Sequence, residues 1–436
     1  MKSVLSLVGR RRGALCLLPA MLIACGASIA PAQDYSADKF DKKLSSRGTL
    51  QRNYAKQPSG DLNERREFEA YITKYYLPAM TQPSPEALED LGKLRSDFFG
   101  KFLWPAAPEI QTWMTQQAME WAKRIGRSSR YHPAVQFNAI YTMGLLDAKY
   151  ASRGQSDPTP LPAANDELNV LARAAMTREN IPNRVLAAAL VGLERQTRYF
   201  ANLPEKNQKD TLKTLFGVLK AEKLAGDYDR EVLGWIYATA GRGLAGAGGA
   251  GPRGAFFSIV AKRASDKSLN LDSRAELVSI LAQMNAQKGS VNAAPAAKVL
   301  RDLAAGIAKY EGKVAKEFED MQIRGGAREI ATGRNNRGRR FRLDEDREVV
   351  LVREDLLLRL VNLQKGVRAV AAVASDAEAA SLKAIDTAIE GARKRIIDPK
   401  EIDLNVAESV KQMAEQIAEA ATVEEPAAAD VATAQP

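Results

Sequence analysis

Apolar residues recur along most of the chain at the three- and four-residue spacing of an α-helix. The stretches 212–219 and 277–284 each place their large apolar side chains on one helical face. The run Ser84-Pro85-Glu86 predicts the start of a helix, because it combines a capping hydroxyl, a proline for the first turn and an acidic side chain. Alternating strand patterns are almost absent. The pattern therefore predicts an all-α protein.

Some of the expected helices resemble one another. The segment 132–147 aligns with 181–196, so that a proline opens each segment and Gly144 matches Gly192, 48 positions later. A period of about 40–47 residues with such features is typical of helical-repeat arrays. Two further segments continue the series at intervals of about 43 to 46 residues, namely 229–240 and 272–284.

The stretch PNRVLAAALVGL (182–193) is similar to the second half of a HEAT- or armadillo-type unit, and the resemblance covers about 130–300. It implies an α-solenoid of antiparallel helix pairs, in which each pair buries its apolar stripe against its neighbours and the stack leaves a curved groove. The alternative is an irregular helical bundle whose amphipathic helices merely look alike.

The first residues have the form of a bacterial secretory signal. Lys2 and the run Arg10-Arg11-Arg12 precede an apolar core over 14–30, which ends in small residues. No other run in the sequence approaches the roughly 18 apolar residues of a membrane-spanning helix. We therefore expect an exported protein of the periplasm or cell envelope.

Two processing sites compete at the end of this signal. Ala30 and Ala32 stand where a signal peptidase reads small residues, and cleavage after Ala32 makes Gln33 the new N-terminus. Leu22-Ile23-Ala24-Cys25 resembles a lipobox, so a lipidated Cys25 and an outer-membrane lipoprotein are the alternative. Contact with a membrane is expected only in that second case. Neither route leaves a cysteine pair for a disulfide, because the only other cysteine, Cys16, lies inside the signal.

Composition divides the chain further. We expect a signal peptide over 1–32, a polar flexible leader over 33–60, a helical-repeat domain over 61–322, an arginine-rich and acidic loop or hairpin over 323–348, C-terminal helices over 349–420 and a disordered tail over 421–436.

Charge is concentrated in one part of the chain. The net charge is +10, and removal of 1–32, with four basic residues and no acid, leaves 59 − 53 = +6. The segment 324–342 holds seven arginines and one acid, which is also +6. The remainder is close to neutral, so a general affinity for nucleic acid is not expected.

Five arginines crowd around Phe341 in that segment and are the candidate anion-binding residues. Arginine suits bidentate contact with phosphate, sulfate or carboxylate. Outside the cytosol, the available anions are lipid head groups, acidic glycans and acidic protein surfaces. The alternative is a solvated loop or small hairpin neutralised by the acidic run 344–346. The five residues are Arg334, Arg337, Arg339, Arg340 and Arg342.

Other chemistry is weakly indicated. The glycine stretch 241–254 contains the letters of a dinucleotide fingerprint, but it follows a helix instead of a strand, and we interpret it as a flexible interhelical loop. The single histidine, His132, is expected to cap a helix or lie at the surface, and Trp113 and Trp121 share a helical face typical of a core. No catalytic residue, metal ligand or cofactor is predicted.

The resulting hypothesis is an exported, non-enzymatic interaction or scaffold protein of the cell envelope, which binds an unknown protein or an anionic envelope polymer through a helical-repeat surface. The alternative is an envelope polysaccharide hydrolase or lyase with a pair of carboxylates in an α-toroid, since many Asp and Glu residues could serve as acid and base.

Overall fold

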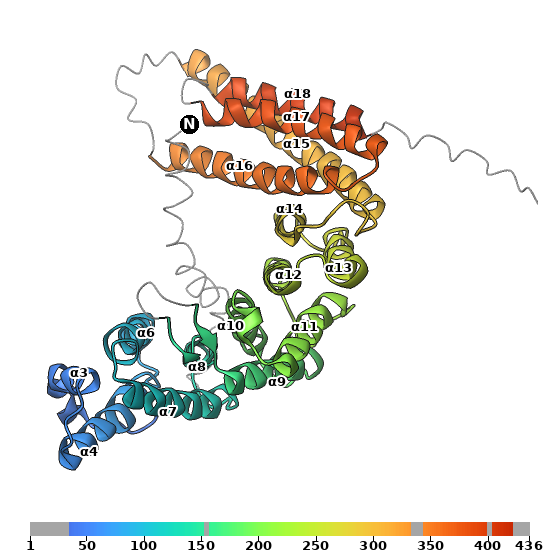
Figure 1. Ribbon diagram of the computed structural model, residues 1–436. Coiled ribbons are helices and arrows are strands. Elements are labelled where there is room, and N and C mark those ends of the chain that lie inside the picture. The colour runs from blue at the N-terminus through green and yellow to red at the C-terminus, as the bar shows by residue number, and fades with distance from the viewer. Residues whose placement is uncertain (1–34, 152–156, 333–342, 399–402, 422–436) are drawn as a thin grey trace, which may run out of the picture. The chain divides into compact units, whose positions relative to one another are not determined.

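A computed structural model describes residues 35–151, 157–332, 343–398 and 403–421 (Figure 1). Within these ranges the chain is almost entirely helical, which confirms the all-α class. The described residues form one two-stranded antiparallel pair, in which β1 (Asp147–Lys149) lies beside β2 (Thr159–Pro160). The HEAT-like repeat arrangement stays a prediction.

The chain divides into two compact units. The first runs to Thr211 and includes Leu224–Gly226, and the second comprises Leu212–Lys223 and everything from Asp227 onward. Helix α11 (Glu205–Lys220) therefore contributes residues to both units. This division does not follow the single domain expected over 61–322, because the helices after 227 group with the C-terminal helices.

The first unit begins with short helices that pack around aromatic side chains, and it continues with longer paired helices. Its elements are η2 (Lys42–Arg47), α3 (Gly48–Lys56), α4 (Leu62–Tyr71), η3 (Ile72–Tyr76), α5 (Leu77–Ala79), α6 (Pro85–Asp97), η4 (Phe98–Leu103), α7 (Pro108–Gly126), α8 (Pro133–Gly144), the pair β1 and β2, α9 (Pro162–Thr177), α10 (Asn183–Thr197) and η5 (Phe200–Asn202).

Helices α8 and α10 are the two segments that align in the sequence, and they pack in parallel with equivalent residues in contact. Arg184 Nε donates to Gln136 Oε1 at 2.7 Å, and the two residues are 48 positions apart. Arg195, on α10, is also 48 positions from its partner Asp147, and it donates one hydrogen bond to each carboxylate oxygen of that residue, at 2.5 and 2.6 Å. The sequence alignment therefore corresponds to a constant register between two neighbouring helices.

A fully buried polar cluster joins α9, α10 and α11 in the first unit. Asn165 Nδ2 donates to Gln196 Oε1 at 2.8 Å and to Thr211 Oγ1 at 2.9 Å. Asn165 Oδ1 accepts from Asn169 and Asn207, at 3.0 and 3.1 Å. Because buried polar groups are costly unless they are hydrogen-bonded, this cluster fixes which helices pack together.

The segment predicted to be a flexible leader is in large part structured, which corrects that prediction. Residues 42–56 form η2 and α3, and α3 buries Tyr54 and Ala55. Further upstream, both carboxylate oxygens of Asp38 accept from Arg124, at 3.0 and 2.6 Å. A few buried side chains and the ion pairs Asp38–Arg124 and Arg47–Glu67 hold this stretch in place, although its overall composition is polar.

The second unit ends in a four-helix bundle. Long helices α15, α16, α17 and α18 pack side by side, and α14 lies against α16 (Figure 1). After α11, the elements of the second unit are α12 (Arg230–Gly248), η6 (Pro252–Gly254), α13 (Ala255–Ala264), α14 (Leu271–Leu281), η7 (Ala282–Met284), α15 (Ala294–Thr332), α16 (Leu343–Ala371), α17 (Asp376–Ile397) and α18 (Asp403–Ala421).

A partly buried ion-pair cluster connects α14, α15 and α16, with Glu311 and Arg359 buried and Asp272 exposed. Arg359 lies between Glu311, which is 4% exposed, and Asp272, whose Oδ1 accepts from Arg359 Nε at 2.6 Å. Burial raises the pKa of the Glu311 carboxyl, and the positive charge of Arg359 opposes that rise. Loss of the arginine would leave a buried carboxylate without its partner, which is among the costlier changes a core can suffer.

Two further predictions on loops need correction. Helix α12 continues to Gly248, so the first half of the glycine stretch is helical, and Gly241 and Gly243 allow close contact with Ile280 and Leu215. Helices also occupy 323–332 and 343–348 of the segment predicted to be a loop or hairpin. The glycines of 241–248 suggest a break by composition, but they are compatible with a helix where neighbouring side chains pack closely against it.

Candidate anion-binding site

The candidate site lies between α16 and α17, which form an antiparallel helical hairpin. Ser375 ends the connection, because its side chain and Glu378 form a capping box at the start of α17. The apolar stripes of both helices face the bundle core, including Leu360, Leu363, Ile385 and Ile389, each 0% exposed. Polar residues at the edge of these stripes are thereby brought together across the hairpin.

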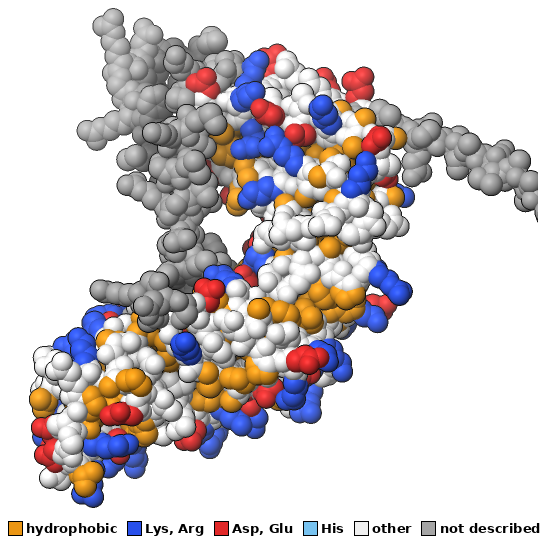
Figure 2. All heavy atoms as spheres, viewed as in Figure 1, with side chains coloured by type: hydrophobic (Ala, Val, Ile, Leu, Met, Phe, Trp, Pro, Cys, Tyr) orange, Lys and Arg blue, Asp and Glu red, His pale blue; other side chains and the backbone are white. Residues whose placement is uncertain are grey.

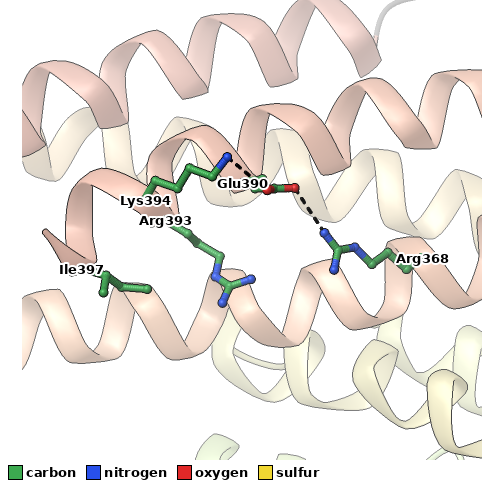
Figure 3. A pocket seen from close by; sticks show the side chains of 5 residues that line it. All are labelled: Arg368, Glu390, Arg393, Lys394 and Ile397. Atoms are coloured by element: carbon green, nitrogen blue, oxygen red, sulfur yellow. Dashed lines mark hydrogen bonds and ion pairs between the residues drawn. The ribbon is translucent and has the colours of Figure 1, made fainter. Parts of the chain in front are cut away.

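These polar residues line an open hollow of about 220 Å³. Figure 3 shows the lining side chains, which come from both helices. On the visible face of the bundle, Lys and Arg side chains gather with a few acidic ones beside them (Figure 2). The residues that line the hollow are Arg368, Glu390, Arg393, Lys394 and Ile397.

Two acidic residues are already engaged by neighbouring cations. Asp386 accepts from Arg368 Nε at 2.9 and 3.0 Å and from Gln364 Nε2 at 2.7 Å. Glu390 contacts Arg368 Nη2 at 3.4 Å and Lys394 Nζ at 3.2 Å. Arg368 and Lys394 are therefore the cations that form ion pairs with these two carboxylates.

Arg393 stands apart from these pairs. Its Nη1 donates to the neutral Gln364 side-chain oxygen, while its Nε is buried and has no hydrogen-bond partner. Within the described part of the chain, no carboxylate lies within ion-pair distance of this guanidinium. Burial, and then the positive charge of Arg368, lower the pKa of Arg393, while the negative charges of Glu390 and Asp386 oppose that fall. The group nevertheless stays charged at neutral pH, because arginine is not deprotonated in proteins.

The charge of the site is positive. Three cations and one carboxylate line the hollow, which gives 3 − 1 = +2, and Asp386 behind it brings the total to +1. An anion in the hollow would add countercharge at Arg393 to that which Glu390 and Asp386 already supply. A carboxylate, sulfate or phosphate group has the geometry for this contact.

Several residues singled out in the sequence lie outside the described ranges. These are the five candidate arginines Arg334, Arg337, Arg339, Arg340 and Arg342, the candidate lipidation site Cys25, and the cleavage residues Ala30 and Ala32.

Other residues from the sequence analysis are described. His132 is the N-cap of α8, and its Nδ1 accepts from Ala134 N at 3.2 Å, which confirms the capping role. Trp121 is 5% exposed and Trp113 packs on Phe68, whereas Trp104 is 59% exposed.

Sequence reasoning missed Arg393. Its neighbours Lys394 and Arg395 make a short basic run on a helix that also carries acids, which is the ordinary composition of a solvated helix face. The pairing across the hairpin shows that Arg368 contacts both acids and that Arg393 meets the amide of Gln364, whereas the Lys394–Glu390 pair lies within α17.

Two further properties of the described residues bear on function. No helix within them is long and apolar enough to cross a membrane. Among the same residues, no group of three or more His, Cys, Asp or Glu side chains is placed to hold a metal ion.

Comparison with known proteins adds no relative. No protein-family profile, no curated protein and no solved structure matches this chain.

Proposed function

We propose that this protein is an exported, non-enzymatic interaction protein of the bacterial cell envelope, and that it binds a partner carrying anionic groups through its helical surface. The observation that carries the proposal is Arg393, a partly buried cation whose Nε has no acceptor among the described residues and whose hydrogen-bond partner there is neutral. A buried donor left unpaired costs on the order of 1–3 kcal/mol, and more for a charged group. An anion in the hollow would offset the charge of this guanidinium.

The secretory signal supports the location, and the +6 charge of 324–342 supports the chemistry of the partner. The alternative, a polysaccharide hydrolase or lyase, needs two carboxylates that face one substrate bond. The hollow between α16 and α17 is lined by one carboxylate, Glu390, which two cations already hold.

Equilibrium binding to two fluorescent polyanions, polyglutamate and dextran sulfate, tests the proposal at low and high salt. We expect Arg393→Gln to weaken binding about tenfold, or ~1.4 kcal/mol, because it removes one charge-assisted contact. The matched control is Lys383→Gln, which makes the same charge change at an exposed position of the same helix. Equal affinities of the two variants for both polyanions would show that the Arg393 site does not bind the anion.

A further inference from the structure

A second arginine without a carboxylate lies in the first unit, where α8 and α10 begin. The parallel register of these helices places Arg184, on α10, against Gln136, which lies one turn into α8. His132 is the N-cap of α8, and its carbonyl oxygen accepts from Gln136 N at 3.0 Å, so it lies one turn before that glutamine. Tyr35 completes the cluster, because its ring meets the imidazole edge-on with centroids 4.8 Å apart.

The hydrogen-bond partner of Arg184 is held in place and carries no charge. Gln136 is 2% exposed, and its Nε2 donates to the Gly126 carbonyl at 2.9 Å, so its Oε1 is held toward Arg184 Nε. Among the described residues, no carboxylate lies within ion-pair distance of Arg184. Burial lowers the pKa of this guanidinium, as expected of a cation that has lost water without gaining a countercharge.

Its neighbours in the same unit show the contrast. Arg127 grips both carboxylate oxygens of Glu167, at 2.5 and 2.6 Å. Arg195 and Arg124 hold Asp147 and Asp38 in the same two-pronged way. These three arginines of the unit each form a bidentate ion pair with a carboxylate. Among the described residues, the Nη atoms of Arg184 have no such partner.

His132 offers a second donor beside this cation. Its Nδ1 accepts from Ala134 N at 3.2 Å, so the neutral ring carries its hydrogen on Nε2. Burial, and then the positive charge of Arg184, lower the pKa of His132. Arg184 and Tyr35 are the charged and titratable groups that face this imidazole from the packed elements.

We propose that Arg184 and His132 form an oxyanion site in the first unit, which takes a phosphate or carboxylate group between the Arg184 fork and the His132 Nε2–H donor. This site is separate from the Arg393 hollow and does not depend on the function proposed for it. Bound anion would also offset the repulsion between the guanidinium and the protonated imidazole, so binding and His132 protonation are linked.

The sequence contains a single histidine, which makes the test direct. In tag-free protein labelled with ¹³C and ¹⁵N in histidine, one imidazole resonance reports the His132 pKa. We expect this pKa to rise, to a saturating limit, as inorganic phosphate is added in one arm and acetate in another. The arm that saturates at the lower concentration identifies the preferred oxyanion. Sodium chloride at matched ionic strength separates site binding from general screening.

Two variants complete the test. Arg184→Gln should raise the His132 pKa in anion-free buffer and abolish its response to phosphate and acetate. Arg178→Gln, the same charge change at an exposed position of this unit, should leave both the pKa and the response unchanged. A His132 pKa that follows phosphate and acetate no more than chloride in the unaltered protein would overturn the proposal, and so would a full response in Arg184→Gln.

Discussion

Gly144 and Gly192 face each other at the contact between α8 and α10, with no room for a side chain on the first of them. A Cβ atom on Gly144 would lie 2.4 Å from the Cα atom of Gly192. Their backbones can approach this closely only because both residues are glycine. The two glycines are the residues that match in the 48-residue sequence alignment, so a similarity between distant segments coincides with a direct contact.

The Gly144→Ala variant should be destabilised by about 3 kcal/mol, because the new methyl group meets backbone and the helices must separate. The Gly192→Ala variant should lose less, about 1–2 kcal/mol, since its nearest contact is the movable Leu168 side chain at 2.9 Å. Denaturant unfolding followed by circular dichroism measures both changes.

Gly92 provides the control for this series. A Cβ at Gly92, inside α6, meets nothing within 4 Å. The Gly92→Ala variant should therefore gain about 0.5–1 kcal/mol from the better helix propensity of alanine. Equal effects at Gly92 and Gly144 would contradict the close α8–α10 packing.

The buried polar cluster gives a second prediction. Asn165→Ala should destabilise the protein by at least about 2 kcal/mol, because Gln196, Asn207 and Thr211 all lose a buried partner. Asn169→Ala should cost less, since Asn169 acts in the cluster only as a donor and its own Oδ1 has no partner. Unfolding free energies of the two variants in the reverse order would show that Asn165 is not the centre of the cluster.

The helical class followed from periodicity, since apolar positions 212–219 and 277–284 could only share a face in a helix. The helix boundaries are harder to predict from the sequence, because they depend on packing against other helices. The glycines at 241–248 favour a loop by composition, yet they lie in α12, where absent side chains permit close packing. Similarly, the polar composition of 33–60 concealed α3, whose stability rests on two or three buried residues and tertiary contacts.

The pH dependence of the Asp38–Arg124 ion pair yields a third prediction. Burial alone would raise the pKa of Asp38, but hydrogen bonds from Arg124 and Tyr131 and the charge of Arg124 outweigh it, so the pKa falls below its ordinary 3.8. A lowered carboxyl pKa stabilises the fold above the unfolded-state value, and that contribution disappears as the pH falls through the lower, folded-state value. Asp38→Asn should therefore cost about 1 kcal/mol at neutral pH, given that Arg124 is half exposed, and almost nothing in strong acid.

Thermal unfolding of the unaltered protein and Asp38→Asn across this range checks the prediction. The two melting curves should converge as the pH drops below 3.8. A difference that grows in acid would have the wrong sign for a carboxylate stabilised by Arg124.

The arginine-rich segment gives a fourth prediction, which follows from the sequence. Replacing Arg337, Arg339 and Arg340 by Ser should change the thermal midpoint very little, because the sequence predicts solvated charges here and such charges contribute little to stability. The same variant should elute at lower salt from an anionic matrix. If its elution is identical to that of the unaltered protein, the segment does not bind anions.

The two proposed anion sites could not be predicted from the sequence for a physical reason. Arginines are common, and what distinguishes Arg393 and Arg184 is the neutral glutamine each one meets on a neighbouring helix. The register between helices decides that contact. The proposed secretory signal, in contrast, can be inferred from the order of residues alone, because such signals are defined by their charge and apolar pattern and not by a fold.

Export is the claim on which the proposed function rests, and the intact mass of the protein recovered from the bacterial envelope tests it most directly. The account predicts a mature chain beginning at Gln33, or one beginning at Cys25 with the added mass of acyl chains. A full-length chain beginning at Met1 and recovered only from the cytoplasm would contradict it.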